Sequence, residues 1–347
     1  MLHNELRKDF LLSRWVVIAT ERSRRPTDFT KQRDPNSETR PAVCPMCPGN
    51  EHMTPPAVLV YLKSNGQIVR KKDLDGFRHK DWLLRVVPNL FPAFSPPESE
   101  SEKQEIMKSD VFGLAVGHHE VLVESPIHDA HPADTELSQL VNVINAYIER
   151  TRELTEKPYV KHVSIFRNHG QLAGASLSHA HSQLIAMPFV PSTVVSEIAS
   201  SKNYWSKNQK CIFCDLVGKE SSGSRFVQGN SDFVAITPYA SVYPMEFWIV
   251  PKKHAMNPLK LTQEEKKTFA QILKSILNAL KSLVNDPPYN YGIHLSVDKR
   301  VQDCYHWHLE VFPKLSIWAG FEKSTGVYIN TIPPETAAAE LRKTLAS

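Results

Sequence analysis

Two segments of the chain carry apolar residues at the three-to-four-residue spacing of an amphipathic helix. One face of the first segment is formed by Leu137, Leu140, Val141, Ile144, Tyr147 and Ile148, and one face of the second by Phe269, Ile272, Leu273, Ile276, Leu277 and Leu280. The second segment opens with Thr262 and Glu265 at the spacing of a capping box. The pattern therefore predicts one long helix in each half of the chain.

Short apolar runs bounded by proline and polar residues flank each predicted helix and indicate strands. The runs correspond between the halves: 82–92 with 233–244, 121–123 with 248–250, and 159–166 with 289–296. Because short turns join successive strands, we expect a mostly antiparallel sheet in each half and an α+β fold. We expect residues 95–110 to form a surface loop. Residues 191–210 are expected to join the two halves.

Cysteine and histidine positions repeat on the same schedule. Cys44 and Cys47 are followed by His128 and His179, which are 51 residues apart; Cys211 and Cys214 are followed by His254 and His306, which are 52 residues apart. Two thiolates from one turn and two distant imidazoles form a common zinc set, and a repeated set argues against simple buried thiols. The turn-like surroundings of both pairs argue against a redox dithiol, which is expected at a helix start. We expect two structural zinc ions, with iron as the alternative metal in one site.

Length favours two domains, and composition is that of an ordinary globular protein. The 347 residues exceed a usual single core, and we place the domains at residues 1–192 and 193–347. A net charge of +4 suits a phosphate-bearing small ligand and is too small for a nucleic-acid-binding face. No run of 18 apolar residues and no N-terminal signal pattern is present, so we expect a cytoplasmic protein without a membrane partner.

The segment Asn168–Gln183 is rich in glycine, serine and histidine. On a strand, His179, His181 and Gln183 project from one face, so one histidine can bind zinc while the next acts as a base or nucleophile. Neutral imidazole attacks phosphorus readily near pH 7. Nearby glycines allow backbone N–H groups to approach phosphate oxygens.

The motif Asn-x-Gly-x-x-x-Gly-x-Ser-x-x-His-x-His-x-Gln over this segment resembles the galactose-1-phosphate uridylyltransferase family of the histidine-triad superfamily, which also contains ADP-glucose phosphorylase. Further matches are Arg14-Trp15-Val16, Asn89-Leu90-Phe91-Pro92, Tyr305-His306-Trp307-His308 and Gly320-Phe321-Glu322. The resemblance implies two tandem histidine-triad-like domains, each an antiparallel sheet with flanking helices. Residues 295–304 lack the glycines of the motif, so we expect a degenerate site in the second domain.

Carried over by position, the resemblance implies that His181 becomes covalently nucleotidylated and that Gln183 hydrogen-bonds the phosphoryl group. The residues implied to hold the nucleotide and its phosphates are Arg22, Arg25, Asn89, Asn168, Gly174 and Ser176. Phe321 and Glu322 are implied to meet the sugar.

The implied reaction is double displacement between a nucleotide sugar and a hexose 1-phosphate. We favour UMP exchange between UDP-glucose and galactose 1-phosphate. Ser316 stands where uridylyltransferases of the best-known branch carry a lysine, which keeps ADP-glucose phosphorylase, with phosphate as acceptor, as the alternative. A nucleotide hydrolase of the histidine-triad type is disfavoured because hydrolases carry histidine at the position of Gln183. A non-catalytic zinc protein is a further alternative, and family habit suggests a homodimer.

Overall fold

The computed structural model describes residues 4–19, 43–105 and 114–346. The chain divides into two compact units. We refer to residues 35–167 and 175–191 as the Cys44 unit, and to residues 1–34, 168–174 and 192–347 as the Cys211 unit. The predicted site residues Arg22 and Arg25 lie outside the described residues.

The Cys44 unit is built on antiparallel strands in the order β4-β3-β5-β6-β8-β7. Its strands are β3 (Leu59–Ser64), β4 (Gln67–Lys71), β5 (Trp82–Pro88), β6 (His118–Val123), β7 (His162–His169) and β8 (His181–Met187), and the last two residues of β7 belong to the other unit. Its helices are η3 (Glu51–Met53), α1 (Glu100–Glu105) and α2 (Leu137–Thr155).

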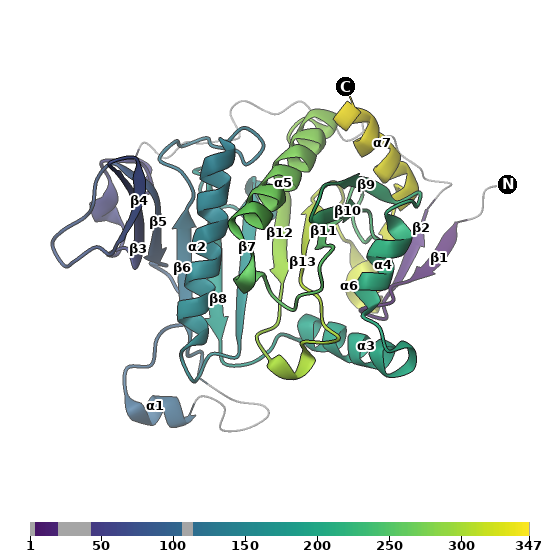
Figure 1. The fold of residues 1–347 in the computed structure, drawn as a ribbon, viewed down its shortest axis with the longest axis horizontal. Helices are drawn as coiled ribbons and strands as arrows, with labels where there is room; N and C mark the ends of the chain where they lie inside the picture. Colours follow the sequence, from purple (N-terminus) through teal and green to yellow (C-terminus); the bar gives the residue numbers. More distant parts are fainter. Residues whose placement is uncertain (1–3, 20–42, 106–113, 347) are drawn as a thin grey trace. The chain divides into compact units, whose positions relative to one another are not determined.

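Helix α2 confirms the first predicted amphipathic segment and runs along the strands of its unit (Figure 1). Arg150 of α2 binds Glu120 of β6 through Nε and Nη2 at 2.8 and 2.7 Å. Since side chains alternate across a strand, α2 lies on the face of β6 opposite to His119 and Val121. The register pairs Val121 with Gln183, so the second face carries the predicted catalytic residues of β8.

The Cys211 unit contains antiparallel strands in the order β12-β13-β11-β10-β9 and a separate sheet β1-β2-β14, in which β14 runs parallel to β2. The larger group comprises β9 (Phe226–Gly229), β10 (Phe233–Ile236), β11 (Phe247–Pro251), β12 (Tyr289–His294) and β13 (His308–Pro313). The smaller sheet comprises β1 (Glu5–Lys8), β2 (Trp15–Ile18) and β14 (Tyr328–Asn330).

The helices of this unit are α3 (Ser192–Asn208), α4 (Ile212–Glu220), α5 (Gln263–Val284), α6 (Gly320–Thr325) and α7 (Pro334–Ala346), with short turns η4 (Gln171–Ala173), η5 (Pro258–Lys260) and η6 (Lys299–Val301). The predicted capping box of α5 is confirmed: Glu265 N donates to Thr262 Oγ1 at 3.1 Å, and Thr262 N to the Glu265 carboxylate at 2.7 Å. Helix α5 packs on β9 and β10 and buries its predicted apolar face.

Two local expectations were wrong, and the expected join between the halves contains a helix. Residues 192–208 form a regular helix, α3, because Val194, Glu197 and Ser201 recur at helical spacing and are buried. Strand β8 begins at His181, so His179 precedes the strand instead of lying on it. Cys211 is the N-cap of α4, so the second cysteine pair lies at a helix start and not in a turn. None of the helices in the described part of the chain is long and apolar enough to cross a membrane.

Candidate functional site

The first cysteine–histidine set converges within the Cys44 unit. Cys44 and Cys47 lie in a turn closed by the hydrogen bond from Cys47 N to Cys44 O at 3.2 Å. The Sγ of Cys47 lies 3.2 Å from Nδ1 of His128 and 3.5 Å from Nδ1 of His179, and the Sγ of Cys44 lies 3.7 Å from Nδ1 of His179. All four ligand atoms lie within 4.8 Å of one another. These four residues could therefore hold a metal ion.

The separations of these atoms fit a tetrahedral zinc ion. Zinc–sulfur and zinc–nitrogen bonds of about 2.3 and 2.05 Å at a tetrahedral angle place sulfur and nitrogen roughly 3.6 Å apart. The other ring nitrogens are engaged as outer contacts: Nε2 of His179 donates to Ser125 O at 2.8 Å, and Nε2 of His128 lies 2.9 Å from Ser178 Oγ. Such contacts fix the ring orientation and leave Nδ1 as the ligand.

The second set converges within the Cys211 unit. The Sγ of Cys214 lies 3.5 Å from Nδ1 of His254 and 3.7 Å from Nδ1 of His306, while the Sγ of Cys211 lies 3.8 Å from Nδ1 of His306. Nε2 of His254 donates to Gln302 O at 2.7 Å. The helix start at Cys211 matches one feature of a redox dithiol, but the two imidazoles on the same thiols favour a metal group.

His181 is the first residue of β8 and is 6% exposed. Its Nδ1 lies 2.7 Å from the carbonyl oxygen of His179. Because a carbonyl oxygen can only accept, Nδ1 carries the proton and Nε2 keeps the lone pair of the neutral ring. Burial lowers the pKa of His181, which favours this neutral form. His179, a member of the first cysteine–histidine set, thus supplies the carbonyl group that sets the tautomer of His181.

The carbonyl oxygen of His181 faces a buried ion pair that the sequence did not suggest. Arg167 of β7 binds the carboxylate of Glu124, and its Nη1 lies 3.5 Å from His181 O. The backbone N–H of Glu124 donates to Ala180 O at 3.0 Å. These contacts fasten the start of β8 to the end of β6. No periodic pattern marks Glu124 or Arg167, because each stands singly at the end of a short apolar run.

Gln183 and Asn89 meet around one histidine. Oε1 of Gln183 lies 2.7 Å from Nε2 of His119, and Nδ2 of Asn89 lies 3.1 Å from the same nitrogen. The amide oxygen of Asn89 accepts from Phe91 N at 2.9 Å. The structure therefore brings together two of the predicted site residues, and it adds His119, which the sequence analysis did not select.

The glycine-rich loop between β7 and β8 contains two glycines in left-handed conformations. Gly170 has φ 79°, and a Cβ there would lie 3.1 Å from Pro288; Gly174 has φ 88°. Oδ1 of Asn168 accepts from Nδ2 of Asn290 at 2.8 Å, which leaves the Asn168 amide N–H groups as donors. Ser176 is exposed.

Phe321 and Glu322 lie in α6 of the Cys211 unit. Phe321 is 48% exposed. The carboxylate of Glu322 accepts from the backbone N–H of Ala319 at 2.9 Å, so it caps the helix in this structure.

His308 occupies the position in the second half that corresponds to His181. It is fully buried, with Nδ1 3.3 Å from His306 O and Nε2 3.1 Å from the Glu310 carboxylate. His294 and Glu197 complete a buried polar cluster, joined by a 2.7 Å contact. Both ring nitrogens of His308 face oxygen acceptors within the protein, so both are engaged in internal contacts.

Comparison with known proteins places the chain in a family. It is 35% identical to ADP-glucose phosphorylase of Arabidopsis thaliana over 98% of this chain and 92% of the relative. It is 28% identical to galactose-1-phosphate uridylyltransferase of Thermotoga maritima over 98% of both chains. The chain belongs to the galactose-1-phosphate uridylyltransferase family. Like these relatives, it is an enzyme of the nucleotidyltransferase type.

Solved structures agree with this family assignment. The crystal structure of an ADP-glucose phosphorylase from Arabidopsis thaliana with bound ADP-glucose matches with a TM-score of 0.80 and 32% identity, covering 98% of this chain and 99% of that one. A uridylyltransferase structure matches with a TM-score of 0.73 and 26% identity, covering 99% of each. Residues 98–347 also match the family described as "Domain of unknown function (DUF4921)", to which the chain equally belongs. The expected α+β uridylyltransferase-like fold is thereby confirmed.

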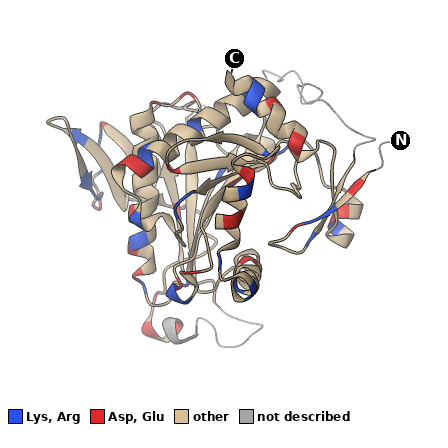
Figure 2. Cartoon of the chain, turned by 45° about the vertical axis from the view of Figure 1, so that its right-hand side comes forward, with Lys and Arg blue, Asp and Glu red and all other residues tan. Residues whose placement is uncertain are grey.

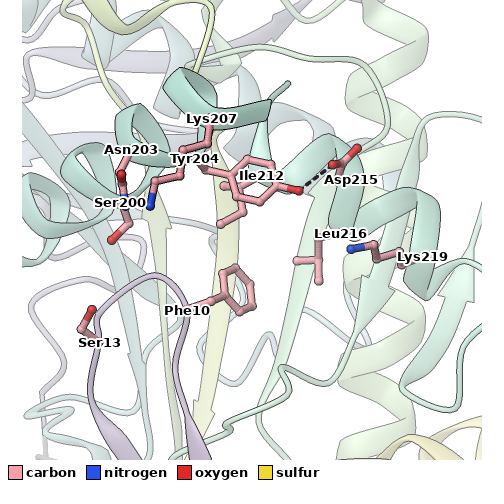
Figure 3. Close-up of a pocket in the computed structure, with 10 residues that line it drawn as sticks. All are labelled: Phe10, Ser13, Ser200, Asn203, Tyr204, Lys207, Ile212, Asp215, Leu216 and Lys219. Atoms are coloured by element: carbon pink, nitrogen blue, oxygen red, sulfur yellow. Dashed lines mark hydrogen bonds between the residues drawn. The ribbon is translucent and has the colours of Figure 1, made fainter. Parts of the chain in front are cut away.

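A surface groove lies within the Cys211 unit. It has a volume of about 420 Å³ and lies against α3, α4 and the β1–β2 turn (Figure 3). Its lining includes Phe10, Ile212 and Leu216, with Lys207 and Lys219. The hydroxyl of Tyr204 donates to Asp215 at 2.6 Å beside it. None of the predicted site residues in the described ranges lines this groove.

Charges of both signs are interspersed in the part of the chain that the structure describes. Figure 2 shows lysine or arginine and aspartate or glutamate positions on the same helices. A nucleic-acid-binding role needs basic residues gathered on one face. The charge pattern favours the small-ligand chemistry of the family.

Proposed function

We propose that the chain transfers a nucleotidyl group by double displacement, with Nε2 of His181 as the nucleophile. Nε2 attacks the α-phosphorus of a nucleoside diphosphate hexose, a P–N bond forms, and the P–O bond to hexose 1-phosphate breaks. An oxygen of a phosphate-bearing acceptor then attacks the same phosphorus and releases His181. The observation that carries this proposal is the 2.7 Å contact between His181 Nδ1 and His179 O, since it directs the ring's lone pair to Nε2.

The remaining predicted residues supply positioning and charge stabilisation. We assign hydrogen bonding of the transferred phosphoryl group to Gln183. Binding of the nucleotide and its phosphates is assigned to Arg22, Arg25, Asn89, Asn168, Gly174 and Ser176, and contact with the sugar to Phe321 and Glu322. The glycine conformations at Gly170 and Gly174 support close approach of backbone N–H groups to phosphate oxygens.

We assign a structural zinc ion to each cysteine–histidine set, with iron as the alternative in one of them. A closed Cys2His2 set offers no coordination position for substrate, so the metal would fasten the fold without activating water. In the Cys44 unit this role extends to the nucleophile, because His179 both belongs to the set and holds the Nδ1 proton of His181.

The sequence repeat divides the chain into a catalytic half, residues 1–192, and a half with a degenerate site, residues 193–347. This division follows the sequence repeat, whereas the two compact units follow the contacts within the fold, so their bounds differ. The engaged ring nitrogens of His308 support a structural role for the second half. We also propose a homodimer, which light scattering of the purified protein tests.

Two substrate pairs suit the proposed chemistry. Adenylyl transfer from ADP-glucose to phosphate is favoured by the 35% identity to the phosphorylase and by Ser316 in place of the lysine of the best-known uridylyltransferases. Uridylyl transfer from UDP-glucose to galactose 1-phosphate is favoured by the motif around His306 and by the 28% identity to the Thermotoga maritima enzyme. We rank adenylyl transfer first, the reverse of the order suggested by the motifs alone.

The deciding experiment is intact mass after brief incubation with ADP-glucose or UDP-glucose separately. An adenylyl adduct discharged by phosphate supports the first pair, and a uridylyl adduct discharged by galactose 1-phosphate supports the second. His181→Ala must abolish either adduct while metal content and unfolding midpoint stay unchanged. Absence of an adduct from metal-replete wild-type protein with both sugars contradicts the proposal.

A further inference from the structure

His119 links the two predicted amide groups of the site. It lies on β6, on the same face as Val121, which pairs with Gln183 of the neighbouring strand β8. Its ring meets Gln183 through Nε2 at 2.7 Å and the backbone N–H of Ala93 through Nδ1 at 3.1 Å. Its own carbonyl oxygen accepts from Asn89 N at 2.8 Å. One residue thus contacts both the strand that carries Gln183 and the segment that carries Asn89.

The backbone contact decides the tautomer of this ring, although Nδ2 of Asn89 also lies 3.1 Å from Nε2, because a backbone N–H cannot turn away as a side-chain amide can. The N–H of Ala93 can only donate, so Nδ1 of His119 accepts and carries no proton. A neutral imidazole then carries its proton on Nε2. That proton points to the amide group of Gln183 across the 2.7 Å contact.

A donor on His119 determines which way the Gln183 amide faces. Only the oxygen of Gln183 can accept from Nε2–H, so the oxygen faces His119 and the NH2 group faces away. The opposite amide orientation would bring two donors together at 2.7 Å. The amide oxygen of Asn89 accepts from Phe91 N, so its NH2 group lies on the side of His119, 3.1 Å from Nε2, and this contact is not a hydrogen bond when Nε2 carries the proton.

We propose that His119 is a positioning residue that locks the amide of Gln183 with its N–H donors directed to the phosphoryl group transferred by His181. The inference rests on the proposed function, since it specifies how Gln183 acts in that reaction. Without the lock, the amide can rotate and present its oxygen to the negatively charged phosphoryl oxygens. Such an arrangement repels the charge that a preorganised donor stabilises.

Two substitutions at His119 separate its two contacts. In His119→Asn, the side-chain oxygen lies close to the position of Nδ1 and can still accept from Ala93 N, but the side chain is too short to reach Gln183. In His119→Gln, the amide nitrogen lies close to the position of Nε2 and can still donate to Gln183. His118→Asn is the matched control, because Nε2 of His118 contacts Tyr159 Oη at 2.8 Å and its ring lies on the other face of β6.

The test is the single-turnover rate of adduct formation with ADP-glucose, or with UDP-glucose where only that sugar labels the wild type. We expect His119→Asn to slow the maximal rate of adduct formation by about 10- to 100-fold, because a donor to the transition state is lost. The half-saturating concentration of the nucleotide sugar should change by less than about threefold. His119→Gln should recover most of the rate. His118→Asn should react like the wild type.

A double substitution tests whether His119 acts through Gln183. We expect Gln183→Ala to slow adduct formation by about 100-fold, and His119→Asn to add less than about a threefold further loss in that background. Fully multiplicative losses, or a rate for His119→Asn equal to that of the wild type, overturn the role of His119 while the adduct itself still stands. A wild-type protein that forms no adduct overturns the proposed function and this role together.

Discussion

The buried ion pair between α2 and β6 offers a quantitative test of how the scaffold behind the site is held. Glu120 and Arg150 are 3% and 4% exposed and form two parallel hydrogen bonds at 2.8 and 2.7 Å. The bidentate geometry matches carboxylate to guanidinium and satisfies both groups without water. We predict that Glu120→Ala destabilises the protein strongly because it leaves a buried guanidinium group without its main partner.

The expected loss follows from the cost of an uncompensated buried charge. Breaking such a pair from one side costs about 3–5 kcal/mol. Arg150 also contacts Glu153, whose side chain is 42% exposed, so a second carboxylate remains and the lower end of the range applies. We therefore expect a loss of about 3 kcal/mol in the free energy of unfolding. Replacing both partners by apolar residues, as in Glu120→Leu with Arg150→Met, should cost less than about 1 kcal/mol.

The assay is urea unfolding followed by tryptophan fluorescence, because Trp82 lies in the same unit and is 2% exposed. With an m-value near 2 kcal/mol/M, a 3 kcal/mol loss lowers the midpoint by about 1.5 M. Lys72→Ala is the control: Lys72 forms an exposed 3.9 Å pair with Glu153, and its loss should cost less than about 0.5 kcal/mol.

Two results refute this reasoning. One is a loss below about 1 kcal/mol for Glu120→Ala, which would show that water or Glu153 fully compensates the buried guanidinium group. The other is a double substitution as damaging as the single one. The folded fraction of Glu120→Ala should retain its rate of adduct formation, because Glu120 projects from the face of β6 opposite to His119.

Two further predictions concern the metal sites and acid stability. Cys44→Ser and Cys211→Ser should each remove one of two bound zinc ions, measured by elemental analysis, and lower the unfolding midpoint, measured by calorimetry. Only Cys44→Ser should also slow adduct formation, since His179 orients His181. Equal slowing by both substitutions contradicts that link. Burial raises the pKa of Glu51, but hydrogen bonds from Lys80 and Trp82 outweigh it and hold the pKa at about 2 instead of 4.5. The ionised form therefore stabilises the fold above pH 4.5 and this contribution is lost as pH falls towards 2, so Glu51→Gln should flatten the acid dependence of the unfolding midpoint.

The parts of the fold that repeat along the chain could be predicted from the sequence. Helices α2 and α5 bury long apolar faces, so their periodicity alone indicates them. The capping box of α5 is a local signal and was confirmed. The cysteine–histidine sets could be predicted because the same residue types recur at the same intervals in both halves, which a single set at long separations does not allow.

Elements held by long-range contacts could not be predicted in the same way. The short strands β1, β2 and β14 bring residues 5–18 beside residues 328–330, a pairing that no local pattern signals. Helix α3 has a weak apolar stripe, and one of its buried residues is Glu197, whose burial depends on contacts with His294 and Tyr305. Local sequence patterns do not include these long-range contacts, so they indicate this helix only weakly.

The candidate site shows the same limit on a finer scale. Strand alternation correctly grouped His181 with Gln183, but it could not show which ring nitrogen of His181 bears the proton, because that depends on the carbonyl group of His179. Nor could it distinguish His119 from His118, although the two are adjacent and only one faces Gln183. A reactive tautomer and a fixed amide orientation are properties of hydrogen bonds between strands. For this reason, the substitutions that keep one hydrogen bond and remove the other at His119 probe what the motif leaves open.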